Sequence, residues 1–194
     1  KEKIITIPSA VDMGAFSVNG QKFDFDKRNI HIPQGVPIIT YIGKAHKNKG
    51  LIEILEALSG INSDFRLLLV SNGALLDLLF TKAHELGIAD KLVHLGFLPP
   101  WEIPNVLRSS DLLIQLENNF SIPIHGPQQP YEAIACQTPL LLSMEIFKKI
   151  QMRFPAKPKN MIVVSDPKDI NSLKNALSDF FASPPHYKEG ASEI

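Results

Sequence analysis

From residue 37 to residue 181 the chain alternates between short apolar runs and longer segments with helical spacing of apolar residues. Runs with the composition of buried strands occupy residues 37–43, 66–70, 92–95, 111–116, 140–142 and 161–164. Helices are predicted at residues 51–58, 74–86 and 101–107, around Glu132, and from Asp166 to about residue 181, with Asp166 as N-cap. Strands that are each followed by a helix form a parallel sheet covered on both faces. The pattern predicts a three-layer α/β domain of about six parallel strands.

The alternation also divides the chain into regions. Residues 1–35 lack it and contain several breakers, so we interpret them as a connector of the interdomain type rather than core. Residues 36–183 form the predicted layered domain, and residues 184–194 form a tail. The first residue is Lys rather than Met, which we interpret as a sign of a longer protein.

Composition excludes several classes of partner. The chain has 20 Lys and Arg and 20 Asp and Glu, so no net charge attracts a nucleic acid or an anionic membrane. Cys136 is the single cysteine and cannot form an internal disulfide, and no secretory signal opens the chain. No apolar run reaches the roughly 20 residues of a membrane span. We therefore expect a cytoplasmic protein.

Ligands of such sheets bind beyond the carboxyl ends of the strands, near the point where the strand order reverses. Five segments follow strands at that edge, at residues 43–44, 71–73, 96–97, 117–126 and 143–144. The first opens the loop Gly43-Lys-Ala-His-Lys-Asn-Lys-Gly50, whose lysines could neutralise a diphosphate, although a solvated basic loop would look the same. The loop is not a Walker A motif, which has four residues between its glycines and a Lys followed by Ser or Thr directly after the second glycine, whereas six residues separate Gly43 and Gly50.

A second candidate segment runs from Phe120 to Ser143 and changes from a proline-rich loop into a helix and then a buried strand. Pro127 or Pro130 can occupy the first helical turn, where a missing N–H is tolerated. Amides of that turn favour a phosphate, and Glu132 could accept hydrogen bonds from both hydroxyls of a ribose. Phosphate donors beside a hydroxyl acceptor indicate a nucleotide site, whereas the alternative is a surface carboxylate that only complements the helix dipole.

The remaining candidates each have a structural alternative. Gly73 would permit close approach of a ligand or simply a tight turn. The backbone of Phe97 and Leu98 could hydrogen-bond the edge of a base, and one of the two side chains could stack on its face. Core packing would also explain Phe97. His125 beside Gly126 could bond a sugar or phosphate or be solvated. Cys136 is predicted to be a packed thiol rather than a nucleophile.

Together these motifs resemble the carboxy-terminal, donor-binding domain of GT-B glycosyltransferases of the "glycosyl transferases group 1" family. The resemblance covers nearly the whole chain. It rests on Ile7-Pro-Ser-Ala-Val-Asp12 followed by Phe16, Tyr41-Ile-Gly-Lys44 with Lys49-Gly50, Leu69-Val-Ser-Asn-Gly73, Val93-His-Leu-Gly-Phe97, Ser110-Asp111 and Tyr131-Glu-Ala-Ile-Ala-Cys-Gln-Thr-Pro139.

The resemblance implies a Rossmann-like half of a GT-B fold that binds a UDP- or GDP-sugar as substrate, with no cofactor. Lys44 and Lys49 would stabilise the leaving diphosphate, Glu132 would bind the ribose, and Phe97 and Leu98 would frame the base. Gly43, Gly73, His125 and Gly126 complete the expected donor site, and no metal ion is expected there. A missing amino-terminal domain would hold the acceptor and allow any peripheral membrane contact. The isolated domain would then bind donor without transferring a hexosyl group.

The sequence departs from the family pattern at three positions. Ile124 stands where a glutamate usually contacts the sugar, Lys44 replaces a customary arginine, and Gln137 replaces a glycine. Two alternatives therefore stay open. One is a non-catalytic nucleotide-binding or interaction domain, and the other is part of a sugar-nucleotide epimerase of related architecture.

Overall fold

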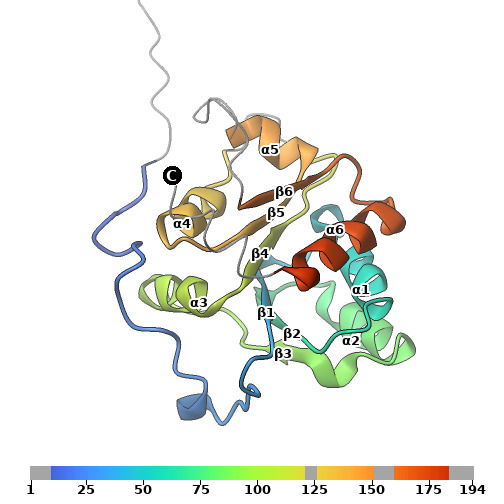
Figure 1. The fold of residues 1–194 in the computed structure, drawn as a ribbon, viewed down its shortest axis with the longest axis horizontal. Coiled ribbons are helices and arrows are strands. Elements are labelled where there is room, and N and C mark those ends of the chain that lie inside the picture. The colour runs from blue at the N-terminus through green and yellow to red at the C-terminus, as the bar shows by residue number, and fades with distance from the viewer. Residues whose placement is uncertain (1–9, 121–125, 151–159, 184–194) are drawn as a thin grey trace, which may run out of the picture.

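The structure is a computed structural model that describes residues 10–120, 126–150 and 160–183 (Figure 1). These residues form a six-stranded sheet in the order β3-β2-β1-β4-β5-β6, and every neighbouring pair is parallel. The strands are β1 (Ile38–Lys44), β2 (Arg66–Asn72), β3 (Leu92–His94), β4 (Leu112–Gln115), β5 (Leu140–Ser143) and β6 (Met161–Val164). The helices are α1 (Leu51–Ser59), α2 (Leu76–Glu85), α3 (Ile103–Ser109), α4 (Gln129–Ala135), α5 (Met144–Ile150) and α6 (Ile170–Ala182). The predicted α/β fold class is confirmed.

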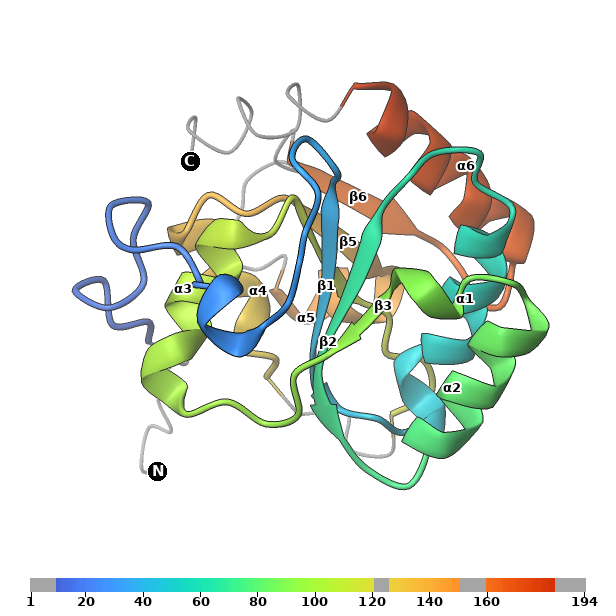
Figure 2. The same ribbon diagram turned by 90° about the horizontal axis from the view of Figure 1, so that it is seen from below.

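Successive residues of each strand supply the two faces of the sheet. In β1, Ile39 and Tyr41 belong to a core shared with α1, α2 and α6, whereas Ile38 and Ile42 belong to a core shared with α3, α4 and α5. Figures 1 and 2 show these two groups of helices on opposite faces of the sheet. Because both faces are buried, the strands are apolar throughout rather than alternating with polar residues.

The register of β1 creates an opening at the centre of the sheet. β1 pairs with β2 along its whole length, from Ile38 opposite Arg66 to Lys44 opposite Asn72. Its ladder with β4 covers only Ile39–Leu112 and Thr40–Leu113. The strand order also reverses between β1 and β4, so the carboxyl ends of these strands form the switch point of the sheet.

The amino-terminal side of the same strand pair is tightly fixed. The Asp111 carboxylate accepts a hydrogen bond from the Ile38 amide at 2.8 Å, and the buried hydroxyls of Ser110 and Thr40 bond each other at 2.6 Å. The Ser110-Asp111 pair of the family pattern therefore has a structural function: it joins β4 to β1 where the ladder begins.

Two features of the helices differ from the sequence prediction. α5 was not predicted; it follows β5 without any breaker, and the Ser143 hydroxyl accepts from the Ile146 amide at 3.2 Å at its start. The prediction of Asp166 as N-cap is wrong. Asp166 closes a separate turn by accepting from the Lys168 amide at 2.9 Å, and Asp169 is the N-cap of α6, accepting from the Ser172 amide at 3.1 Å.

The segment before β1 is also more closely packed than expected. It contains a short 3-10 turn at Asp26–Arg28, and Phe23 is only 7% exposed within the core on the α3, α4 and α5 face. The Arg108 guanidinium of α3 donates to the carbonyls of Gln21 and Ser17 at 2.8 and 3.1 Å. Describing this segment as connector rather than core was therefore wrong for Phe23, while the boundaries at residues 35 and 184 stay predictions.

Candidate functional site

A cavity of about 420 Å³ lies at the switch point between β1 and β4. Its walls come from the end of β1, the loop before α1, the end of β4 and the start of α4. The lining residues are Tyr41, Ile42, Gly43, Lys49, Gln115, Glu117, Gly126, Pro127, Gln128, Gln129 and Glu132. The cavity thus brings together Gly43, Lys49, Gly126 and Glu132 of the predicted site.

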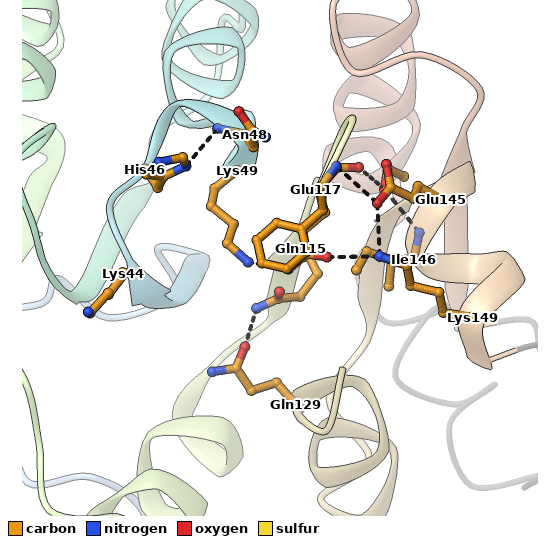
Figure 3. A network of polar contacts seen from close by, with 12 residues as sticks. Lys44, His46, Asn48, Lys49, Gln115, Glu117, Gln129, Glu145, Ile146 and Lys149 are labelled. Atoms are coloured by element: carbon orange, nitrogen blue, oxygen red, sulfur yellow. Dashed lines mark hydrogen bonds and ion pairs between the residues drawn. The ribbon is translucent and has the colours of Figure 1, made fainter. Parts of the chain in front are cut away.

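Two glutamine side chains bridge the opening where the ladder between β1 and β4 has ended. The Gln115 amide donates to the Ile42 carbonyl at 3.2 Å. It also donates to the Gln129 side-chain oxygen at 2.7 Å, the bond drawn between these two residues in Figure 3. Gln115 is buried, so these bonds satisfy an amide that would otherwise be desolvated without a partner. They also fix the first residue of α4 against the end of β4.

Helix α4 places Glu132 in the cavity wall. Pro130 lies in its first turn, as the sequence predicts, and the Glu132 amide bonds the Gln128 carbonyl at 3.2 Å. Burial raises the pKa of the Glu132 carboxyl. Its carboxylate has no hydrogen-bond partner within the described part of the chain. The cavity therefore contains a half-buried acceptor that is available to a ligand.

The basic loop contributes one of its lysines to the cavity. Lys49 forms an ion pair with the buried carboxylate of Glu117, and its ammonium lies 4.7 Å from the centroid of the Phe120 ring. Lys44 is exposed, does not line the cavity and stands apart from the polar network in Figure 3. Of the two lysines predicted to hold a diphosphate, Lys49 is therefore the one placed at the cavity.

Glycines allow the elements around this loop to approach closely. Gly50 has φ +67°, and a Cβ there would lie 2.7 Å from the Cβ of Leu116, so this glycine lets α1 begin against the end of β4. Gly73 has φ +131°, and a Cβ there would lie 2.7 Å from the carbonyl oxygen of Ala45. Gly73 does not line the cavity. It supports the basic loop from the side of β2, which favours the turn interpretation over direct ligand contact.

Other predicted site residues lie elsewhere. Phe97 is 56% exposed and Leu98 packs against the core, and neither lines the cavity. The core-packing alternative is therefore wrong for Phe97, and the prediction that this pair frames a base stays a prediction. His125 and Ile124 lie outside the described residues. Cys136 is 5% exposed, and burial raises the pKa of its thiol to about 11, which agrees with the predicted packed thiol.

The polar residues Gln115, Glu117, Gln128 and Gln129 line the cavity and were not predicted as site residues, and neither was Lys149, which contacts Glu117 without lining the cavity. Lys149 reaches the site from α5, where its ammonium lies 3.4 Å from Glu117 and 2.8 Å from Glu145. The sequence did point to Glu117, because this residue directly follows a buried strand at the edge of the sheet where ligands bind. It did not point to Lys149, because the helix that contains this residue was not predicted.

Within the described residues, no group of three or more His, Cys, Asp and Glu side chains is arranged to hold a metal. The sequence contains an Asp-x-Asp pair, Asp24 and Asp26, but Asp24 pairs with Lys27 at 2.8 Å and neither aspartate lines the cavity. That donor binding needs no metal stays a prediction. No helix in the described ranges is long and apolar enough to cross a membrane.

Residues 22–191 match the family model described as Glycosyl transferases group 1. The chain belongs to this family. A curated relative, the 2-deoxystreptamine glucosyltransferase of Streptomyces kanamyceticus, is 30% identical over 115 residues, which cover 57% of this chain and 30% of the relative. This member of group 1 spans less than half the length of the curated relatives it matches, 30% and 42% of them.

Solved structures show the same fold. The C-terminal domain of the group 1 family protein LpcC from Francisella tularensis has a TM-score of 0.70 at 16% identity and covers 95% of this chain and 97% of that domain. Anabaena HepE, solved in complex with UDP and glucose, has a TM-score of 0.68 at 14% identity and covers 94% of this chain and 50% of that one. The group 1 chain therefore has the Rossmann-like fold of GT-B glycosyltransferases.

Proposed function

We propose that this chain is the donor-binding domain of a glycosyltransferase and that its cavity at the switch point binds a nucleoside-diphosphate sugar. One observation carries the proposal: Lys49 and Glu132 line the same cavity of about 420 Å³, although 83 positions separate them in the sequence. A cation matches the phosphates of a nucleotide, and a hydroxyl acceptor matches its ribose. Both of these parts are present whatever the base is.

Each end of the ligand has a partner in this arrangement. The Glu132 carboxylate accepts hydrogen bonds from the ribose hydroxyls, and a charged acceptor strengthens such bonds. Lys49 attracts the diphosphate, and the exposed Lys44, which directly follows the cavity-lining Gly43, would add a second positive charge. Helix α4 has only seven residues, about two turns, so most of the diphosphate charge would be met by the lysines.

Transfer would break the bond between the anomeric carbon of the sugar and the diphosphate oxygen, while an acceptor oxygen forms a new bond to that carbon. The bonding electrons leave with the nucleoside diphosphate, so its charge rises in the transition state. Lys49 and Lys44 would stabilise this charge. Acceptor and any general base belong to an amino-terminal domain in this proposal, so the isolated chain binds donor without transferring sugar.

The comparisons favour one donor class. HepE was solved with UDP and glucose, and the Streptomyces relative is named a glucosyltransferase. A UDP-hexose is therefore the donor we propose to test first, with the GDP form as its competitor, and we propose the cytoplasm, where such donors are made, as the location of the protein.

The proposal is tested by titration calorimetry of the chain with UDP, GDP and the corresponding monophosphates, with and without a chelator. We expect the diphosphate to bind about tenfold more tightly, because a second phosphate adds charge next to Lys49, and we expect the chelator to change nothing. Lys49→Met should abolish most of the preference. Lys47→Met is the matched control, because Lys47 is on the same loop but does not line the cavity. Equal affinities for diphosphate and monophosphate would overturn the proposal.

A further inference from the structure

We propose that Lys149, which does not line the cavity, is a positioning residue of the donor site: it acts through Glu117 and sets the charge that a diphosphate meets at Lys49. The inference rests on the proposed function, since it concerns the same cavity. It names a residue on α5 as a determinant of affinity for the phosphates.

Glu117 connects the two lysines. Its side chain is only 2% exposed, and its two carboxylate oxygens face different cations: Oε1 pairs with Lys49, and Oε2 lies 3.4 Å from the ammonium of Lys149. Both ammonium groups also lie against the Phe120 ring, 4.7 and 5.5 Å from its centroid. Figure 3 shows Lys49 and Lys149 reaching this carboxylate from different elements.

The position of α5 relative to Glu117 is fixed by hydrogen bonds of its own. The buried Ser143 hydroxyl donates to the Glu117 carbonyl at 2.6 Å and accepts from the Ile146 amide at 3.2 Å. Lys149 is one turn further along α5, 12% exposed, and it also pairs with Glu145 at 2.8 Å. The packing of α5 therefore fixes the position of the Lys149 ammonium next to Glu117.

The arrangement has an electrostatic consequence for the cavity. Glu117 and Lys49 line it, so a diphosphate that approaches Lys49 also meets the negative charge of Glu117. Lys149 does not line the cavity, and its positive charge partly offsets the negative charge of Glu117. Without Lys149, the carboxylate would lose the cation that faces its Oε2 and would neutralise Lys49 more completely.

The direct test is calorimetry of the chain with UDP and UMP for a set of charge variants. A unit charge one or two side chains away near a protein surface changes affinity by about three- to tenfold. We expect Lys149→Met to weaken UDP binding by this factor and UMP binding less, and to reduce the salt dependence of UDP affinity. Lys149→Arg should keep the affinity of the wild type, and Glu117→Gln with Lys149→Met should restore it, since the pair of changes leaves the net charge unaltered.

Lys148→Met is the matched control, because Lys148 is an exposed neighbour on the same helix with the same charge. The inference would be overturned if the wild type binds UDP and Lys149→Met binds it with the same affinity. It would also be overturned if Lys148→Met weakens UDP binding as much as Lys149→Met does. Loss that persists in the folded double variant would show a purely structural role and would also overturn it. If Lys149→Met does not fold, Lys149→Gln and the double variant are measured instead. If the wild type binds UDP no more tightly than UMP, the proposed function itself would be refuted, and the role of Lys149 would fall with it.

Discussion

Replacement of Glu132 by glutamine separates a ribose-binding carboxylate from one that only complements a helix. The change keeps the size of the side chain and removes its charge. In the structure the Glu132 side chain lines the cavity, and burial raises the pKa of its carboxyl. Ionised Glu132 is therefore partly desolvated without a compensating partner in the described residues, which is the state expected of a group that awaits a ligand.

The expected loss follows from the number of bonds. A carboxylate can accept from both ribose hydroxyls with charge assistance, whereas the amide accepts through a single neutral oxygen. The affinity should fall by about 1.5–3 kcal/mol, which is about ten- to a hundredfold. The effect on folding should be small, because removing a favourable interaction with the helix end, about 0.3–1 kcal/mol, is opposed by removing a desolvated charge.

The assay compares a nucleoside diphosphate with its 2′,3′-dideoxy form by calorimetry. Wild type should prefer the ribose form, and Glu132→Gln should lose most of that preference while its free energy of unfolding stays within about 1 kcal/mol of wild type. Glu53→Gln is the control, because Glu53 is also a first-turn carboxylate but does not line this cavity. A Glu132→Gln variant that still discriminates the two sugars as wild type does would refute the assignment.

The pH dependence of the same titration provides a second measurement. Since burial raises the pKa of Glu132, the carboxyl takes up a proton at a higher pH than an ordinary glutamate, whose pKa is about 4.3. The ribose contribution should therefore be complete above the raised pKa and should be lost as the pH falls through it. The Glu132→Gln variant should lack this dependence, and a similar fall in both proteins would assign the titration to another group.

Three further predictions concern the scaffold of the site and are checked by urea denaturation. Gln137 has φ +56°, a left-handed conformation that glycine adopts without strain, so Gln137→Gly should stabilise the fold by about 0.5–1 kcal/mol; a loss would contradict this account of the family's glycine. Asp169→Ala should cost about 1 kcal/mol by removing the cap of α6, whereas Asp169→Asn should cost much less; equal losses would argue against capping. Gly73→Ala should cost clearly more than the roughly 1 kcal/mol of Gly87→Ala, since both have positive φ but only at Gly73 would the new Cβ meet backbone, at 2.7 Å; equal costs would remove the argument from close approach.

The strands could be predicted because their signal is local. Each is a short apolar run between breakers, and the predicted run at residues 37–43 differs from β1 by one residue at each end. Helix α5 lacked such a signal, because β5 passes into it at Ser143-Met144 without glycine or proline. The N-cap of α6 was misplaced for a related reason: Asp166 and Asp169 are both good caps, and only the path of the chain decides which of them faces the helix.

The site was predictable only in part, because some of its contacts depend on strand order. Lys49 and Glu132 are found from motifs of adjacent residues. Gln115 and Glu117 enter the site because β4 is the neighbour of β1, which brings them to residues about 70 positions earlier, and the sequence does not state that order. Local motifs therefore predicted Lys49 and Glu132, which line the cavity, but not the residues that hold its walls together.

Lys49 and Glu132 both line the cavity but would meet the proposed ligand in different ways. Glu132 has no partner in the described residues, so hydrogen bonds from a ribose would replace lost hydration and meet no competitor. Lys49 already has a partner in Glu117, so a diphosphate must share its ammonium with a buried carboxylate. The number of lysines near the loop therefore does not determine the affinity for phosphate. It depends on how strongly Glu117 holds Lys49, and thus on the charges on the far side of Glu117.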